Sequence, residues 1–520
     1  MSDLVRRCAS AFFLCCLPAL APAQGSQRFR AEEATISEIH AAIAGGRLTC
    51  RELVGQYLAR IAAYDKNGPA INAIVVVNPK AMEIADSLDR HFRAAGRVGS
   101  LHCIPIIVKD NMQTTDLPTT AGSLAFEGWI PKKDAFQVRK IREAGAIVIA
   151  KSNMAEFAFS PYETVSSILP GYTKNPYALD RVTAGSSGGT AASVAAGFGT
   201  LGLGTDTGNS IRGPSSHQAL VGIRSTMGLT SRAGVVPLFL SQDIAGPIAR
   251  TVADAAAVLQ VVEGEDPDDP VTAASRGRRM PDYLAALDPD GLRGARVAVL
   301  RQAYQSSGND SEVVAIFAQA IADLRRAGAT VFDSIDIPTL DSLRRSQRGG
   351  CPQFKYDLNR FLEALGSDGP PLKTLEAIIR SNRFHPTVQR RLEQEQLAES
   401  PPEENAGCRA RDEFRAGLRA AVVKAMDDAR VDALIYPTWS NPPRLIGDLN
   451  TPHGNNSPFF SPSTGFPAMT VPMGYSRGTL PAGMTLFGRP WSEATLIRLS
   501  YAYEQSTKHR RPPASTPALP

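Results

Sequence analysis

The chain has 520 residues, of which 43% are hydrophobic and 21% are charged, a composition typical of globular proteins with a sizeable core. The formal net charge of +5 comes from 56 basic and 51 acidic residues. This near balance gives no support to nucleic acid or an anionic membrane surface as a partner.

The N-terminus has the three parts of an export signal. Arg6 and Arg7 precede an apolar run over residues 11–20, and Ala-Pro-Ala at 21–23 supplies the small residues that a signal peptidase requires. The run is too short to span a bilayer comfortably, and the alternative is a buried N-terminal helix. We therefore predict a signal peptide over residues 1–23. We expect an exported protein, periplasmic or secreted, with no stable membrane association after cleavage.

Helices are predicted over most of the next seventy residues. Two capping boxes, Thr35-x-x-Glu38 and Thr49-x-x-Glu52, each open a helix because the side chains at the two ends of the box satisfy free backbone N–H groups. A third helix is predicted over 79–94.

Strands and helices alternate from residue 104 onward, which predicts an α/β fold with a mixed sheet covered by helices on both faces. The strands are expected at 104–108, 146–150, 297–300, 329–335, 431–436 and 468–471, and the helices at 135–144, 190–197 and 311–327.

The chain divides into one catalytic domain over 24–507 and two less regular parts. Residues 337–430 are richly charged, with helical stretches and few strand signals, and are interpreted as a variable helical insertion near the site entrance. Residues 508–520 are basic and proline-rich, and we expect a disordered tail.

Four cysteines remain once the signal is removed: Cys50, Cys103, Cys351 and Cys408. Their wide spacing, without a C-x-x-C pair, argues against a metal site. A disulfide between Cys351 and Cys408 is expected because both flank the same variable region, and free buried thiols are the alternative. No H-E-x-x-H motif occurs, which also argues against a metal, and we expect no cofactor.

Residues 183–213 are rich in glycine and serine, which suits a loop that aims backbone N–H groups at a ligand. Three interpretations compete on composition. A phosphate-binding loop lacks its G-x-x-x-x-G-K-[ST] spacing, and a Ser-His-Asp hydrolase lacks its G-x-S-x-G elbow. His217 follows too closely to indicate a triad. The third interpretation is a purely structural turn system.

Several segments follow one another along the chain in the same order as the motifs of the amidase signature family of serine hydrolases, and they resemble those motifs. The central segments are Gly-Ser-Ser-Gly-Gly at 185–189 and Gly-Thr-Asp-Thr-Gly-Asn-Ser-Ile-Arg at 204–212, and the family uses this spacing between the two serines. The resemblance extends from about residue 33 to 503 and is weakest over the insertion. Further matching segments lie at 101–110, 119–123, 221–226, 228–231, 246–250 and 461–468.

The resemblance implies an amide-bond hydrolase with a triad of Ser210, Ser186 and Lys109. A serine hydroxyl is a weak nucleophile without a base. In this family the base is a lysine that acts through a second serine, and the peptide bond before that serine is cis. The resemblance therefore implies that Lys109 is the base and that Ser186 relays the proton. A lysine side chain in water has a pKa of about 10.4. Lys109 must therefore be buried to be neutral. Activity should rise from neutral to alkaline pH as Lys109 loses its proton.

The resemblance also implies an oxyanion hole of four backbone N–H groups, from Thr207, Gly208, Asn209 and Ser210. The family commonly has glycine where this chain has Asn209. We expect the loop to keep its shape because asparagine tolerates unusual backbone angles.

Further residues near the triad are expected to act in support. Asp206 and Arg212 should pair to hold the loop in shape, together with Ser187, and a solvated surface pair is the alternative. Cys103 stands where the family commonly has glycine, and we expect packing there rather than chemistry.

The substrate does not follow from the triad. The family places pocket-lining residues at Met154, Glu156, Phe157 and Ala158, which suggest an apolar acyl or aryl pocket, with ordinary core packing as the alternative. The candidates are a secreted amidase for primary or peptide C-terminal amides, an aryl acylamidase or carbamate hydrolase, and the glutaminase component of a tRNA-dependent amidotransferase. A non-catalytic binding protein on an amidase scaffold is the fourth. The expected partner is a small-molecule or peptide amide, and the oligomeric state stays open.

Overall fold

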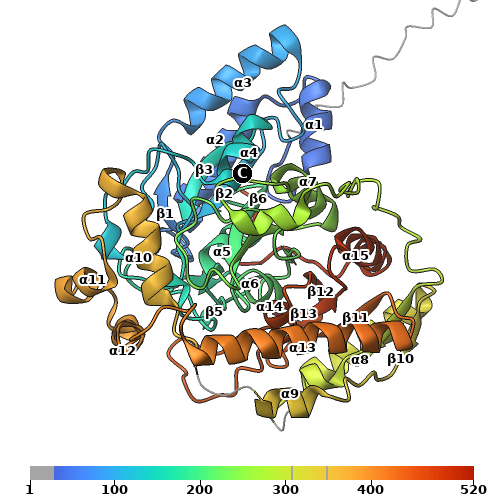
Figure 1. Cartoon of the computed structure of the whole chain (residues 1–520). Coiled ribbons are helices and arrows are strands. Elements are labelled where there is room, and N and C mark those ends of the chain that lie inside the picture. The colour runs from blue at the N-terminus through green and yellow to red at the C-terminus, as the bar shows by residue number, and fades with distance from the viewer. Residues whose placement is uncertain (1–28, 306–307, 347–349) are drawn as a thin grey trace, which may run out of the picture.

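The structure is a computed structural model that describes residues 29–305, 308–346 and 350–520 (Figure 1). The predicted signal peptide, residues 1–23, lies outside the described residues. No helix in the described ranges combines the length and the apolar character needed to cross a membrane.

One mixed sheet runs through the molecule in the order β1-β3-β2-β6-β8-β7-β12-β13-β11-β9-β10. β2 is parallel to β3 and β6, β9 is parallel to β10 and β11, and the other neighbours are antiparallel. A separate hairpin pairs β4 with β5. The strands are β1 (Ile74–Val77), β2 (Pro105–Lys109), β3 (Ile147–Ser152), β4 (Lys174–Asn175), β5 (Ala178–Val182), β6 (Leu201–Asp206), β7 (Val221–Arg224), β8 (Ile244–Ala249), β9 (Arg296–Val299), β10 (Thr330–Phe332), β11 (Ala433–Pro437), β12 (Ala468–Ser476) and β13 (Leu480–Phe487).

Helices connect and cover the strands (Figure 1). The α-helices are α1 (Ile36–Ala44), α2 (Cys50–Tyr64), α3 (Ala81–Ala95), α4 (Phe136–Glu143), α5 (Gly188–Ala195), α6 (Arg212–Ser216), α7 (Val252–Val262), α8 (Ser311–Arg326), α9 (Leu340–Ser346), α10 (Phe354–Ala364), α11 (Leu375–Ser381), α12 (Pro386–Gln396), α13 (Ala406–Asp428), α14 (Phe460–Thr464) and α15 (Glu493–Thr507). Short 3₁₀ helices are η1 (Leu124–Phe126), η2 (Glu156–Ala158), η3 (Pro270–Ser275), η4 (Arg301–Ala303) and η5 (Gly366–Asp368).

Alternate residues of β11 show that both faces of the sheet are covered. Ala433 and Ile435 pack into the cluster that contains residues of α7, α8 and α15. Leu434 and Tyr436 point the other way and pack with residues of α13 and α14. Successive side chains of a strand face opposite sides, so one buried strand serves two cores. The predicted mixed sheet with helices on both faces is confirmed.

The predicted elements agree with those observed, including both capping boxes. Several strands that the sequence analysis did not predict contain glycine or proline, such as β6, β8 and β13, whereas β1, β4 and β5 contain neither. Gly202 in β6 shows why: a Cβ there would lie 2.4 Å from Thr190 Cγ2 of α5. Close packing of a helix requires a residue that weakens the strand pattern.

Residues 337–430 contain only helices among the residues described, but these helices pack in two places. α10, α11 and α12 form an apolar cluster with Phe126 and Phe157. α9 and α13 instead cover the sheet, where Leu340, Leu418 and Val422 lie in the core. Figure 1 shows α10–α12 at the left side of the molecule and α13 running across the lower part of the view. Only α10–α12 therefore extend away from the sheet scaffold.

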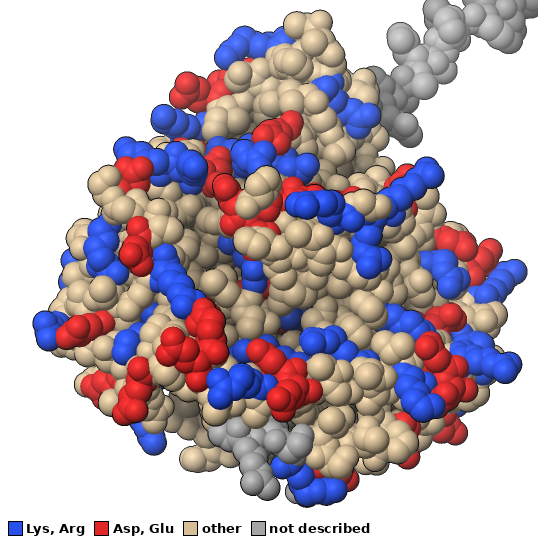
Figure 2. Space-filling view, in the orientation of Figure 1, with Lys and Arg blue, Asp and Glu red and all other residues tan. Residues whose placement is uncertain are grey.

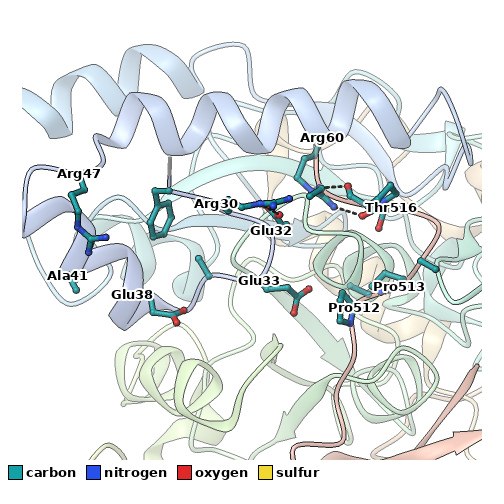
Figure 3. Close-up of a pocket in the computed structure, with 16 residues that line it drawn as sticks. Arg30, Glu32, Glu33, Glu38, Ala41, Arg47, Arg60, Pro512, Pro513 and Thr516 are labelled. Carbon is teal, nitrogen blue, oxygen red and sulfur yellow. Dashed lines mark hydrogen bonds and ion pairs between the residues drawn. The ribbon is translucent and has the colours of Figure 1, made fainter. Parts of the chain in front are cut away.

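The expectation of a disordered C-terminal tail is wrong. Arg60 of α2, which is 4% exposed, donates to Thr516 O and Pro517 O, each at 2.8 Å. Arg510 pairs with Glu33 at 2.8 Å. The tail borders a cavity of about 740 Å3 beside α1 and α2 (Figure 3). Prolines prevent regular structure, but the backbone carbonyls of such a segment still accept hydrogen bonds from distant side chains, which composition does not reveal.

Two disulfides join the four described cysteines. The predicted Cys351–Cys408 bond is present, with an S–S distance of 1.98 Å. The second bond, Cys50–Cys103, was not predicted and ties the first residue of α2 to the turn before β2. His102 lies close to both sulfurs, so these three residues could together hold a metal ion, but the sulfurs are joined to each other in this structure.

Candidate active site

The three predicted catalytic residues come from the end of one strand and from two loops. Lys109 is the last residue of β2, Ser186 lies in the turn before α5, and Ser210 lies between β6 and α6. β2 and β6 are hydrogen-bonded neighbours, so their carboxyl ends meet at one edge. All three side chains are buried, and Ser210 is 5% exposed.

Lys109 is placed to act as a base on Ser186. Its Nζ lies 2.7 Å from Ser186 Oγ and 2.7 Å from Thr205 Oγ1. Burial lowers the pKa of Lys109 to about 7, although the carboxylates of Asp206 and Asp243 partly oppose the shift. Desolvation disfavours the ammonium form. A large fraction of the protein molecules therefore carries a neutral amine at Lys109 near pH 7.

The peptide bond between Gly185 and Ser186 is cis, as the resemblance implied. A Cβ at Gly185 would lie 2.4 Å from Ser160 O and 2.5 Å from Glu163 O. Glycine is therefore required here by the close approach of the 160–163 backbone.

Four consecutive backbone N–H groups between β6 and α6 are free to bind an anion. Across the described ranges, the N–H groups of Thr207, Gly208, Asn209 and Ser210 donate to no other protein group. Free donors on a loop that is otherwise buried can bind developing negative charge without first breaking a hydrogen bond.

Asp206 holds this loop through two arginines. Arg212 Nε lies 3.0 Å and Arg224 Nη1 lies 3.3 Å from its carboxylate, and all three side chains are fully buried. Burial alone would raise the pKa of Asp206, but Arg212 and Arg224 outweigh it and hold the pKa below its ordinary value. The predicted Asp206–Arg212 pair is therefore an interior one and not a solvated surface pair.

Ser187 connects the same loop to the turn before α5. Its hydroxyl donates to Thr205 O at 3.1 Å, and its backbone N–H donates to Ser210 O at 3.3 Å. Both contacts join the segments that carry Ser186 and Ser210.

The structure adds polar residues that the sequence analysis did not single out. Thr205 contacts Lys109, and Asn111 Nδ2 donates to the hydroxyl of Thr205 at 3.2 Å. Thr207 Oγ1 donates to Asp243 Oδ1 at 2.5 Å, and burial raises the pKa of Asp243. Thr205 lies in β6, inside the 204–212 segment, where strand alternation could have indicated an inward-facing side chain. Nothing in the sequence pointed to Asp243.

The residues predicted to line a substrate pocket belong to a loop that contacts Ser186. The loop reaches the site through Ala155 N, which donates to Ser186 O at 3.1 Å. Met154, Phe157 and Ala158 are buried in the apolar cluster shared with α10–α12.

Glu156 was also predicted to line the pocket, but its carboxylate is engaged in hydrogen bonds within the protein. Its carboxylate accepts from Ser167 N at 3.0 Å and His385 N at 2.9 Å. Burial raises its pKa, and these hydrogen bonds oppose the shift. The carboxylate thus joins the loop to the N-terminal end of α12.

Comparisons with known proteins agree with this geometry. The Amidase family model matches residues 52–497. A probable amidase of Arabidopsis thaliana is 33% identical over 94% of this chain and 93% of its own, and a glutamyl-tRNA(Gln) amidotransferase component from Moorella thermoacetica is 34% identical over 90% and 95%. The crystal structure of peptide amidase from Stenotrophomonas maltophilia superposes with a TM-score of 0.84, at 36% identity, over 92% of this chain and 98% of that chain. The chain belongs to the amidase signature family and is a hydrolase that cleaves amide C–N bonds through a Ser-Ser-Lys mechanism.

Proposed function

We propose that Ser210 is the nucleophile, Ser186 the proton relay and Lys109 the general base. The observation that carries this assignment is the 2.7 Å contact between Lys109 Nζ and Ser186 Oγ, at a lysine whose pKa is lowered to about 7. A neutral amine at hydrogen-bond distance can accept the Ser186 proton.

The reaction then follows from these positions. Ser210 Oγ attacks the amide carbonyl while its proton passes to Ser186 Oγ and the Ser186 proton passes to Lys109 Nζ. The oxyanion is held by the N–H groups of residues 207–210. The C–N bond breaks as a proton returns to the leaving nitrogen, which leaves an ester on Ser210. Water, deprotonated along the same path, hydrolyses the ester and frees the acid.

For the substrate, we propose primary amides, including peptide C-terminal amides. The support is the peptide amidase likeness, at 36% identity over nearly the whole chain. The apolar side chains of Met154 and Phe157 belong to the loop whose Ala155 N–H donates to Ser186 O, and they favour an apolar acyl group.

We also propose that the enzyme is exported. The signal-like N-terminus and the two disulfides support this, because structural disulfides persist mainly in oxidising compartments.

Product release from a substrate panel tests the function. The mature enzyme is incubated with an aliphatic primary amide, a peptide C-terminal amide, an acyl anilide and an aryl carbamate. We expect ammonia from the first two and none from Ser210→Ala, whose circular dichroism spectrum stays that of the wild type. Aniline release with the primary amides untouched would contradict the proposed substrate. Undiminished ammonia release by Ser210→Ala would contradict the proposed nucleophile.

A further inference from the structure

Asn209 immediately precedes the proposed nucleophile, at a position where the family commonly has glycine. Its side chain is buried, with 1% of the residue exposed. The φ angle of Asn209 is not positive, so the tolerance of asparagine for unusual backbone angles is not what this position uses. The contacts of the side chain must account for the residue instead.

The side-chain amide of Asn209 joins two segments at the site. Its Nδ2 donates to Gly185 O at 2.8 Å and to Pro161 O at 3.2 Å. Gly185 O belongs to the peptide group whose nitrogen is that of Ser186. Pro161 O also accepts from Gly185 N at 2.9 Å, so the amide and the relay turn share one acceptor.

The neighbouring helix leaves room for this side chain. A Cβ at Gly213 of α6 would lie 2.3 Å from Asn209 Oδ1 and 2.6 Å from Nδ2. Any side chain at residue 213 would therefore displace the amide. Asn209 Oδ1 has no hydrogen-bond partner in the described chain, so the donor Nδ2 makes the polar contacts of this side chain.

Few other links hold the nucleophile loop to the relay turn. Among the hydrogen bonds that the structure describes, residues 209 and 210 otherwise meet residues 185–187 through Ser187 N and Ser210 O, at 3.3 Å. That bond is longer than the typical N–H to O distance. The Asn209 amide provides the shorter connection, next to the peptide group of Ser186.

We propose that Asn209 is a positioning residue that fixes the nucleophile loop against the relay turn and so sets the approach of Ser210 to Ser186. This inference rests on the proposed triad. The hydroxyl-to-hydroxyl proton transfer requires close alignment, and a displacement of about 1 Å at such a site can lower the rate by about 100-fold.

Three variants test the role. Asn209→Asp keeps the shape but replaces the donor with an oxygen that faces two carbonyls. Asn209→Gly introduces the residue that is common in the family. Asn441→Asp is the matched control: it is 7% exposed, and its Nδ2 also donates to two carbonyls, Gly308 O at 2.9 Å and Pro452 O at 2.8 Å, away from residues 185–187 and 207–210.

The measurement is the second-order rate constant for inactivation by a serine-directed fluorophosphonate, as a function of pH, on protein whose thermal midpoint is recorded. We expect both Asn209 variants to react at least about 10-fold more slowly. Their apparent pKa should stay that of the wild type, because the Lys109–Ser186 contact is intact. Asn441→Asp should react within about 2-fold of the wild type, whatever its thermal midpoint, because its contacts do not reach the triad.

A wild-type rate in Asn209→Gly would overturn the proposal, because the side chain would then only fill space. A wild-type rate in Asn209→Asp would overturn it as well, because the donor would then be dispensable. Labelling of Ser210→Ala at the wild-type rate would instead refute the triad, so the two failures are distinguishable.

Discussion

At Lys109, burial lets an amine lose its proton near neutral pH. The side chain is fully buried at the end of β2, and the two hydroxyls that it contacts carry no charge. The carboxylates of Asp206 and Asp243 favour the protonated form, but desolvation outweighs them and lowers the pKa to about 7.

The pH dependence of kcat/KM tests this. The active form is the neutral amine, so activity should be lost as the pH falls below the Lys109 pKa. We expect kcat/KM to rise through an apparent pKa near 7 and to level off above it. Activity that does not change between about pH 6 and 9 would contradict a lysine base with this pKa.

Asp206 is the only described carboxylate paired with Arg212 and Arg224, and all three are buried. Replacing it by asparagine leaves two buried guanidinium groups without a counter-charge. We expect Asp206→Asn to lower the free energy of unfolding by about 3–5 kcal/mol, measured by urea denaturation.

The exposed Glu376–Arg380 pair of α11 offers the control. Glu376→Gln should change the free energy of unfolding by less than about 0.5 kcal/mol. Equal effects of the two substitutions would show that the buried ion pairs of Asp206 contribute no more to the free energy of unfolding than an exposed ion pair does.

At the scale of elements, the C-terminal tail after α15 acts as part of the fold. Arg60 donates to Ala196 O and Gly197 O of the α5 region and to Thr516 O and Pro517 O of the tail. Deletion of residues 512–520 removes two of these acceptors. We expect a loss of about 1–3 kcal/mol in the free energy of unfolding.

Deletion of residues 518–520 is the matched control, because it leaves all four acceptors of Arg60 in place. It should be neutral. If both deletions have the same effect on the urea midpoint, the Arg60 contacts do not hold the tail.

Elements with a local signal could be predicted from the sequence, whereas elements that depend on close packing could not. The capping boxes at Thr35 and Thr49 and the β-branched strand before Lys109 indicate their structure within a few residues. β6 does not, because Gly202 is needed for the approach of α5 and weakens the strand pattern. The tail escaped prediction because Arg60, which holds it, lies about 450 residues earlier.

The same distinction applies to the site. Lys109, Ser186 and Ser210 could be predicted as site residues because each lies in a sequence segment that resembles a family motif. Asp243 has no such signal: it contacts Thr207 only because β8 pairs with β6. The partnership of Lys109 with Thr205 spans 96 residues of sequence, and only the sheet brings the two together.

At the scale of the whole molecule, the disulfides support the proposed export of the enzyme, and the surface charge is mixed. Figure 2 shows acidic and basic side chains interspersed over the visible face. All four described cysteines lie in disulfides. The denatured, unreduced mature protein should therefore have no thiol that reacts with a thiol reagent. The denatured, reduced protein should have four reactive thiols per molecule. Reactive thiols before reduction would contradict an enzyme that matures in an oxidising compartment.

The central claim is that hydrolysis passes through an ester on Ser210. The most direct measurement is peptide mapping by mass spectrometry after acid quenching of the enzyme with a slowly hydrolysed amide substrate. The account predicts an acyl group on the peptide that contains Ser210, and none in Ser210→Ala. An acyl group on another residue, or turnover with no acylated peptide alongside full activity of Ser210→Ala, would contradict it.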